Sequence, residues 1–175
     1  MMILVSGGAA SGKSEYAEAL LLRLANGAGK TYLATMKRDG EEAERRILRH
    51  RQLREGKGFE TLEAPVNIDA VAGACREAVL LECISNLTAN EMFGEEVHTA
   101  AAERVAAEVD VLQKKAKLLV AVTNEVFSDG LSYDEMTVNY IRELAAVNRL
   151  LAKRADAVVE VVYGIPVWRK GAGIC

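Results

Sequence analysis

The chain has 175 residues, of which 50% are apolar and 27% are charged, and its formal net charge is −3. This length suits one ordinary domain with one hydrophobic core, and the composition excludes a disordered chain. The small negative charge gives no general attraction to nucleic acid or to an anionic membrane, so neither is an expected partner.

Cysteine spacing and hydropathy exclude two further classes. The cysteines Cys75, Cys83 and Cys175 are widely spaced and form no C-x-x-C pair, which argues against a disulfide framework and against a zinc site. No segment approaches the ~18 consecutive apolar residues of a membrane-spanning helix, and the N-terminus lacks a basic segment before a long apolar one. We therefore expect a cytoplasmic protein without stable membrane insertion.

Apolar runs and helical periodicity alternate along the chain. In chain order we expect a strand at residues 2–5, a helix at 14–26, a strand at 31–35, a highly charged helix at 41–54, a strand at 59–63 and a weak helix at 66–77. A strand at 79–83, a long amphipathic helix at 96–117, a strand at 118–123, a helix at 133–155 and a strand at 157–163 follow. Residues 167–170 are expected to add an edge strand after the breaker Gly164-Ile165-Pro166.

A glycine-rich segment connects the first expected strand to the first helix. It is Gly7-Gly8-Ala9-Ala10-Ser11-Gly12-Lys13-Ser14, which fits the phosphate-loop pattern G-x-x-x-x-G-K-[ST]. Backbone N–H groups of such a loop wrap phosphates, the lysine offers a cation to the β- and γ-phosphate oxygens, and the serine ligates Mg²⁺. A chance glycine turn is the alternative, but the flanking strand and helix match the motif. We expect all eight residues to bind nucleotide and Lys13 to act in catalysis.

This loop and the strand–helix alternation predict the fold class. We expect an α/β protein with a P-loop NTPase-like three-layer α/β/α arrangement and a mostly parallel central sheet, because strands joined through helices pair in parallel. The run at residues 167–170 is expected to pair as an antiparallel edge strand. Residues 1–175 are expected to form one nucleotide-binding kinase or nucleotidyltransferase domain.

An acidic residue ends the apolar run before Cys83. Phosphate-loop proteins place an acid near Mg²⁺ at the end of a neighbouring buried strand, and Glu82 follows Val79-Leu80-Leu81. We expect Ser14 and Glu82 to hold the metal, with Glu82 acting through water. The alternative is an acid that ends a strand at the surface.

The charged helix contains one of the two histidines. Ala43, Ile47, His50 and Arg54 share one helical face, and this face is expected to point toward the nucleotide. Nearby arginines disfavour the imidazolium and attract a triphosphate, which suits His50 as a nucleophile toward phosphorus. The alternatives are a structural histidine in the core and arginines that pair with glutamates on a solvated helix.

Taken together, these motifs resemble the bifunctional adenosylcobinamide kinase / adenosylcobinamide-phosphate guanylyltransferase family of cobalamin biosynthesis, over almost the whole chain. The early landmarks are Ile3-Leu4-Val5-Ser6-Gly7-Gly8-Ala9, Ser11-Gly12-Lys13-Ser14, Glu18, Tyr32-Leu33-Ala34-Thr35, Arg46-Ile47 and His50-Arg51. The later ones are Thr61-Leu62-Glu63, Leu80-Leu81-Glu82-Cys83-Ile84, Val122-Thr123-Asn124-Glu125-Val126, Asn148, Ala155-Asp156 and Gly164-Ile165-Pro166.

The resemblance implies two reactions at one site. ATP or GTP phosphorylates the aminopropanol hydroxyl of adenosylcobinamide, and GMP from GTP is then transferred onto that phosphate through a guanylylated histidine, which falls on His50. Mg²⁺ is the implied metal, and a homo-oligomer such as a trimer is the implied assembly. Nucleotide contacts are implied for residues 7–14, for Ala34, Thr35 and Met36, for Arg51, Gln52, Leu53 and Arg54, and for Glu63 and Glu82.

Some positions depart from the family pattern. Ala10 stands where an arginine is frequent, no tryptophan follows the histidine helix, and Phe127-Ser128-Asp129-Gly130 replaces a stretch with glycine and proline. A P-loop small-molecule kinase without guanylyltransferase activity therefore remains an alternative. A GTP-binding regulatory module is a second, although no N/T-K-x-D guanine motif is present.

The residues that follow the strand at 118–123 are polar. Asn124 and Glu125 are expected at the carboxyl end of a parallel strand, where α/β proteins place ligand contacts. Their alternative role is to cap a helix or to stabilise a turn.

Overall fold

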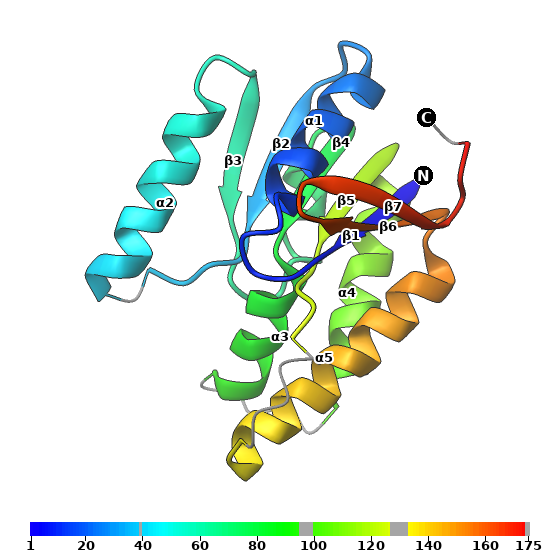
Figure 1. Cartoon of the computed structure of the whole chain (residues 1–175). Helices are drawn as coiled ribbons and strands as arrows, with labels where there is room; N and C mark the ends of the chain where they lie inside the picture. The colour runs from blue at the N-terminus through cyan, green and yellow to red at the C-terminus, as the bar shows by residue number, and fades with distance from the viewer. Residues whose placement is uncertain (39, 95–99, 127–132, 174–175) are drawn as a thin grey trace.

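The computed structural model describes residues 1–38, 40–94, 100–126 and 133–173, and for Glu42, Ala43, Arg46, Arg49, His50, Arg51 and Leu53 it describes the backbone alone. Figure 1 shows the described strands and helices. The strands are β1 (Met2–Ser6), β2 (Lys30–Ala34), β3 (Phe59–Glu63), β4 (Ala78–Glu82), β5 (Leu118–Val122), β6 (Ala157–Val162) and β7 (Ile165–Lys170). The helices are α1 (Lys13–Ala25), α2 (Gly40–Arg54), α3 (Ile84–Phe93), α4 (Ala101–Lys115) and α5 (Glu135–Arg154), with a 3₁₀ turn η1 (Ala72–Ala74).

The strands form one sheet in the order β3-β2-β4-β5-β1-β6-β7. Every pair is parallel except β6–β7, which is an antiparallel hairpin, so the expected mostly parallel sheet with an antiparallel edge strand is confirmed. The register places Ala34 opposite both Glu63 and Glu82. The ends of β3, β2 and β4 therefore lie side by side at the carboxyl edge of the sheet.

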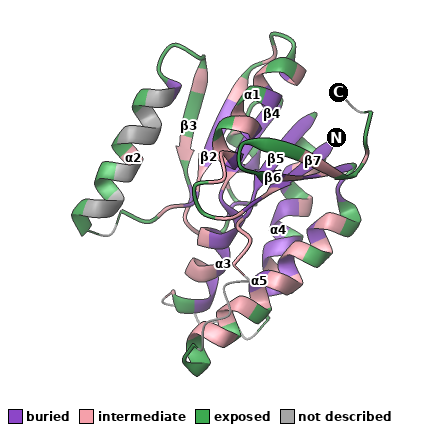
Figure 2. Ribbon diagram, in the orientation of Figure 1, coloured by how far each residue is buried: buried purple, intermediate pink, exposed green. Residues whose placement is uncertain are grey.

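Helices cover both faces of this sheet (Figure 1). Alternate residues of a strand point to opposite faces, and β1 illustrates the consequence. Ile3 and Val5 belong to the apolar cluster that includes Leu20 and Leu21 of α1. Met2 and Leu4 belong to the cluster that includes residues of α3, α4 and α5. Figure 2 shows the buried residues concentrated in the central strands between these two layers.

The helix α2 stands at the β3 edge of the molecule, outside the two covering layers (Figure 1). Most of its described residues other than Ile47 and Arg54 are exposed, which agrees with its high charge. Arg45 and Glu41 form an i,i+4 ion pair of 2.9 Å on this exposed surface. Arg45 therefore pairs with a glutamate on a solvated helix surface, as the alternative interpretation of the arginines predicted.

Two expected helices differ from the structure. Residues 66–77 contain only the short turn η1, because Asn67 takes a left-handed φ of 53° and its backbone N–H bonds to the Glu91 carboxylate. The backbone N–H of Ile68 likewise bonds to the Glu108 carboxylate. These long-range bonds replace the helical ones. The helix expected at 96–117 begins at Ala101, and Glu96 and His98 lie outside the described residues.

The helix α3 was not expected from the sequence. It begins directly after β4, and its buried residues Ile84, Leu87, Thr88 and Glu91 have the spacing i, i+3, i+4, i+7. A helical signal was therefore present, although a buried threonine and glutamate made it weakly apolar. Among the helices the structure describes, none is long and apolar enough to span a bilayer.

Candidate nucleotide-binding site

The glycine-rich loop connects the end of β1 to the start of α1. A Cβ atom on Gly7 would lie 2.5 Å from Ser11 Oγ and 2.6 Å from the backbone oxygen of Val161, so only glycine fits there. Gly12 adopts a left-handed φ of 86°, and no side chain caps α1 at this residue. The first N–H groups of α1 are therefore available to an anion, and the helix dipole favours one.

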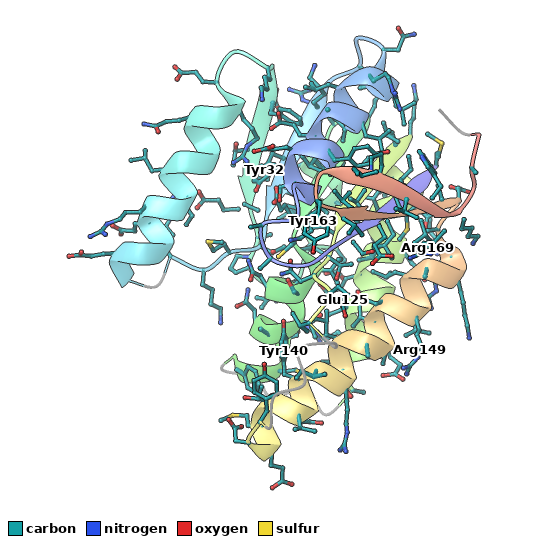
Figure 3. All side chains as sticks on the ribbon, in the orientation of Figure 1. Tyr32, Glu125, Tyr140, Arg149, Tyr163 and Arg169 are labelled. Atoms are coloured by element: carbon teal, nitrogen blue, oxygen red, sulfur yellow. The ribbon has the colours of Figure 1, made fainter. Side chains whose placement is uncertain are left out.

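Neighbouring segments hold this loop in place. The backbone N–H of Glu125 donates to the oxygen of Gly7 over 3.0 Å, and that of Gly164 donates to the oxygen of Ser11 over 2.8 Å. Figure 3 shows Tyr163, the residue before Gly164 in the sequence, at the turn between β6 and β7. The loop is thus braced by the segment after β5 and by the β6–β7 hairpin.

Lys13 is the first residue of α1 and is only 9% exposed. Its Nζ donates to the backbone oxygen of Gly8 over 3.0 Å, so the ammonium group lies back across the loop. This position suits a cation that neutralises phosphate charge held by the loop. A buried lysine at such a site stabilises charge that develops in a transition state more than a solvated one does.

Ser14 and Glu82 meet at the carboxyl edge of the sheet. Ser14 Oγ donates to Glu82 Oε1, and Tyr32 Oη donates to Glu82 Oε2 over 3.1 Å. Burial, followed by the nearby Glu82 charge, raises the pKa of Tyr32 well above its usual value, so Tyr32 stays a neutral donor. Glu82 thus has one oxygen directed to the loop and the other fixed by the central sheet.

The Ser14 and Glu82 oxygens fit a magnesium site. Among the residues that the structure describes, no three His, Cys, Asp or Glu side chains come together at a possible metal site. Mg²⁺ commonly binds one or two protein oxygens and completes its shell with substrate phosphates and water. Ser14 Oγ and the Glu82 carboxylate form an oxygen pair of this kind beside the phosphate loop.

Arg54, the last residue of α2, reaches the central sheet. Its Cζ lies 3.3 Å from the centroid of the Tyr32 ring, and Figure 3 shows Tyr32 on the side of the sheet toward α2. Arg54 is 8% exposed, and its buried Nε has no hydrogen-bond partner among the described residues. A buried guanidinium with an unused donor is suited to bind an anion.

A pocket extends from the phosphate loop across the carboxyl edge of the sheet. Its lining combines the loop, the ends of β2, β3, β4 and β5, one face of α2 and the first turn of α3. The lining residues are Lys13, Ser14, Tyr32, Ala34, Met36, Ile47, Arg54, Thr61, Glu63, Glu82, Cys83, Asn86, Val122 and Asn124.

Several residues that the sequence singled out meet in this pocket. They are Lys13, Ser14, Ala34, Met36, Arg54, Glu63, Glu82 and Asn124. The other predicted loop residues, Gly7, Gly8, Ala9, Ala10, Ser11 and Gly12, lie outside its lining, with Ala9 and Ala10 exposed. Among the described residues, Glu63 forms a 2.6 Å ion pair with Arg38.

Other predicted site residues lie elsewhere. Thr35 is fully buried, and its Oγ1 donates to the oxygen of Cys83 and accepts from the Cys83 N–H, both over 2.8 Å. Thr35 therefore braces the end of β4 behind the pocket. Gln52 is exposed and lines an adjoining hollow between α2 and β3, which shares Arg54 and Thr61 with the pocket. The side chains of His50, Arg51 and Leu53 lie outside the described residues.

The helical register nevertheless places position 50. Ile47 and Arg54 line the pocket, and residue 50 is three positions after Ile47 and four before Arg54. Positions with this spacing share one face of an α-helix. The backbone of α2 therefore carries position 50 on the face whose described members border the pocket.

The pocket also contains residues that sequence reasoning assigned no role. Tyr32 is expected only as part of a strand and of the family resemblance, and no pattern in the sequence points to Asn86. Asn86 lies in the first turn of the unexpected helix α3. Its role was not recognisable from spacing because it depends on where α3 begins relative to β4.

Comparison with known proteins identifies relatives over nearly the full length. The family model described as cobinamide kinase / cobinamide phosphate guanyltransferase matches residues 3–168. The bifunctional adenosylcobalamin biosynthesis protein CobU of Escherichia coli (strain K12) is 35% identical over 95% of this chain and 98% of its own. The CobU protein of Salmonella typhimurium is 36% identical with the same coverage, and the CobP protein of Pseudomonas aeruginosa is 29% identical over 98% of both chains.

Solved structures share the fold at low sequence identity. The flagellar accessory protein FlaH from Methanocaldococcus jannaschii matches 97% of this chain and 77% of its own, with a TM-score of 0.55 and 15% identity. The KaiC-like protein PH0186 from Pyrococcus horikoshii matches 91% of this chain and 71% of its own, with a TM-score of 0.53 and 12% identity. The family model matches residues 3–168, and this match includes the phosphate loop and almost all of the strands of the parallel sheet. The chain therefore belongs to the cobinamide kinase / cobinamide phosphate guanyltransferase family of enzymes.

Proposed function

We propose that this protein phosphorylates adenosylcobinamide with ATP or GTP and then transfers GMP from GTP onto the phosphate, giving adenosyl-GDP-cobinamide. The observation that carries the proposal is the pocket in which the phosphate loop and Glu82 face the Ile47–Arg54 face of α2. One binding site for a triphosphate is thus bordered by both a phosphate-transfer loop and the helix that contains His50. Membership of the family and relatives named as bifunctional support both activities.

In the kinase step, the loop amides and Lys13 hold the β- and γ-phosphates and neutralise the charge on the transferring group. Phosphoryl transfer depends mainly on positioning and electrostatic stabilisation, so these groups supply most of what the reaction needs. Ser14 and Glu82 would hold Mg²⁺, which supplies further charge neutralisation on the phosphate oxygens when bound.

In the guanylyl-transfer step, His50 is the nucleophile toward the α-phosphate of GTP, and pyrophosphate leaves from the phosphate loop. The cobinamide phosphate then displaces the histidine and takes the GMP group. Arg54 supports this step because its buried guanidinium borders the same pocket, where it can bind a phosphate oxygen. Ala34, Met36 and Glu63 are proposed as further nucleotide contacts on this side, together with Arg51 and Leu53.

A labelling experiment tests the proposal. Purified protein with Mg²⁺ and α-labelled GTP is expected to form a covalent GMP adduct that is acid-labile and stable to alkali, seen on a denaturing gel and by intact mass. His50→Ala should abolish the adduct, and His98→Ala, which changes the other histidine, should retain it. Absence of the adduct from protein that still binds GTP and phosphorylates cobinamide would indicate a kinase alone, and absence of both activities would overturn the proposal.

Three further properties belong to this proposal. The small-molecule partners are the corrinoid and the purine nucleotides, with Mg²⁺ as the metal. We place the enzyme in the cytoplasm, where nucleoside triphosphates are available. We also propose a homo-oligomer such as a trimer, which sedimentation at several protein concentrations would test.

A further inference from the structure

The pocket has two ends on either side of Glu82. One end is formed by α2 and β3, and the proposed guanylyl transfer uses it. The other end is formed by β5 and α3, where Val122, Asn124 and Asn86 line the wall. The sheet order explains the division, because β4, which carries Glu82, lies between β2 on one side and β5 on the other. Neither proposed step assigns a role to the β5 end.

The Asn124 side chain at this end is held in one orientation. Its Nδ2 donates to Ser85 Oγ over 2.6 Å, and Ser85 is a buried residue of α3. The Ser85 hydroxyl lies 3.0 Å from Cys83 Sγ, and Tyr140 Oη of α5 donates to the Ser85 backbone oxygen over 3.2 Å. An amide whose donor group is bound to a fixed partner presents its oxygen in a fixed direction.

The backbone at Asn124 is fixed as well. Thr123 Oγ1 donates to Asn148 Oδ1 over 2.7 Å, and Asn148 Nδ2 donates to the backbone oxygen of Asn124 over 3.4 Å. Asn148 lies on α5, so β5, α3 and α5 all contribute to placing this residue. Such convergent support is typical of a side chain whose position matters for a reaction.

Asn124 also supplies the pocket with a hydrogen-bond acceptor that no described residue uses. The acids of the lining are engaged, since Glu82 accepts from Ser14 and Tyr32, and Glu63 accepts from Arg38. Asn124 Nδ2 is used by Ser85, and Asn124 Oδ1 has no hydrogen-bond partner among the residues the structure describes. An oriented acceptor thus lies in the pocket that also contains Lys13.

We propose that Asn124 is a catalytic residue of the kinase step, in which Oδ1 accepts a hydrogen bond from the hydroxyl of the alcohol acceptor. This inference rests on the proposed function and assigns the β5 end of the pocket to the acceptor. The hydroxyl oxygen forms a bond to the γ-phosphorus while the bond from that phosphorus to the β,γ-bridging oxygen breaks. The nucleoside diphosphate leaves with the electron pair, and the hydroxyl proton passes to a non-bridging oxygen of the transferred phosphoryl group, because a neutral amide does not take it.

The variants Asn124→Ala and Asn124→Asp test this role. Misplacement of a reacting group costs about 100-fold in rate, so Asn124→Ala should lower kcat for cobinamide phosphorylation about 100-fold. Asn124→Asp keeps an acceptor oxygen of the same shape, so kcat should stay within about tenfold of the unmodified protein, while its charge raises the KM for nucleotide. Asn139→Ala, on the exposed surface of α5, is the matched control for loss of an asparagine side chain.

Self-guanylylation of His50 serves as the second readout, because it needs no alcohol acceptor. For Asn124→Ala we expect the two reactions to respond differently. The kinase step should be slow, whereas the rate of adduct formation from GTP should stay within about threefold of that of the unmodified protein. Equal losses in both reactions would indicate a structural role and overturn the inference, as would a kinase kcat within threefold of the unmodified protein. If Asn124→Ala does not fold, as judged by thermal unfolding, Asn124→Ser is measured against the same criteria.

Failure of this inference is distinguishable from failure of the proposed function. An unmodified protein that neither phosphorylates cobinamide nor forms a GMP adduct overturns both. An unmodified protein with kinase activity but without the adduct still tests Asn124, with GTP binding by calorimetry as the reference readout in place of the adduct. Normal kinase activity in Asn124→Ala then rejects the role of Asn124 and leaves the proposed kinase function standing.

Discussion

The guanidinium of Arg54 lies over the ring of Tyr32, with Cζ 3.3 Å from the ring centroid. Tyr32 in turn donates to Glu82, which accepts from Ser14 of the phosphate loop. A residue of α2 is therefore connected to the loop through two intermediates of the central sheet. A cation over a buried aromatic ring stabilises by about 1–2 kcal/mol, so this contact contributes to holding the end of α2 against the site.

Tyr32→Phe separates the two contacts of Tyr32. The variant keeps the ring beneath Arg54 but removes the hydroxyl that fixes Glu82 Oε2. Loss of one such hydrogen bond costs about 0.5–1.5 kcal/mol, so we expect the Mg²⁺ concentration for half-maximal kinase activity to rise by about two- to twelvefold. The nucleotide KM at saturating Mg²⁺ should change little.

Tyr32→Leu is the comparison for that prediction. It removes both the hydroxyl and the ring, so the nucleotide KM should rise as well as the Mg²⁺ requirement. A Mg²⁺ titration at several nucleotide concentrations measures both. If Tyr32→Phe and Tyr32→Leu behave alike, the ring contact with Arg54 has no part in nucleotide binding.

Gly7→Ala is expected to destabilise the protein. The added Cβ meets the backbone oxygen of Val161 at 2.6 Å, and a backbone atom of β6 has little freedom to move. Overpacking of this kind costs about 1–3 kcal/mol in the free energy of unfolding. Gly8→Ala is the matched control, because a Cβ there meets no atom within 4 Å. Urea unfolding compares the two, and equal stabilities would contradict the close approach at Gly7.

The buried carboxyl of Glu108 is expected to make stability depend on pH. Glu108 is 4% exposed and shares Arg104 of α4 with Glu91 of α3, with nitrogen–oxygen distances of 3.2 and 2.8 Å. Burial, followed by repulsion from Glu91 and Asp69, raises the pKa of Glu108 to about 7, although the N–H of Ile68 and Arg104 oppose the shift. Two carboxylates that share one guanidinium explain why the ion pair does not keep this pKa low.

The direction of the pH effect follows from that raised pKa. An unfolded glutamate has its ordinary pKa of about 4.3, so between there and about pH 7 the folded protein binds more protons than the unfolded one. The contribution of Glu108 to the free energy of unfolding therefore falls as pH rises through this window. The glutamine of Glu108→Gln stays neutral at every pH, so the variant's free energy of unfolding should depend less on pH. Relative to the unmodified protein, the variant should be more stable at pH 7.5 than at pH 5. Urea unfolding at both pH values checks this, and parallel changes in the two proteins would contradict it.

The local pattern of the chain was sufficient for most of the architecture. Apolar runs of about five residues predicted most of the strands, and the structure confirms the expected strands with shifts of one or two residues at the ends. The glycine loop between β1 and α1 was predictable because its geometry depends on residues adjacent in sequence. The 66–77 segment was predicted wrongly as a helix, because the carboxylates of Glu91 and Glu108 capture its backbone N–H groups from elsewhere in the chain.

The sequence by itself determined the strand–helix alternation, the phosphate loop and the resemblance to the family, since each depends on short-range spacing or on the order of motifs. The role of His50 stays a prediction. Only the tertiary structure decided that Tyr32 meets both Glu82 and Arg54, that Thr35 supports the end of β4, and that Ser85 orients Asn124. The physical reason is that these contacts join residues 22 to 50 positions apart, and their geometry is set by the order in which the strands pair.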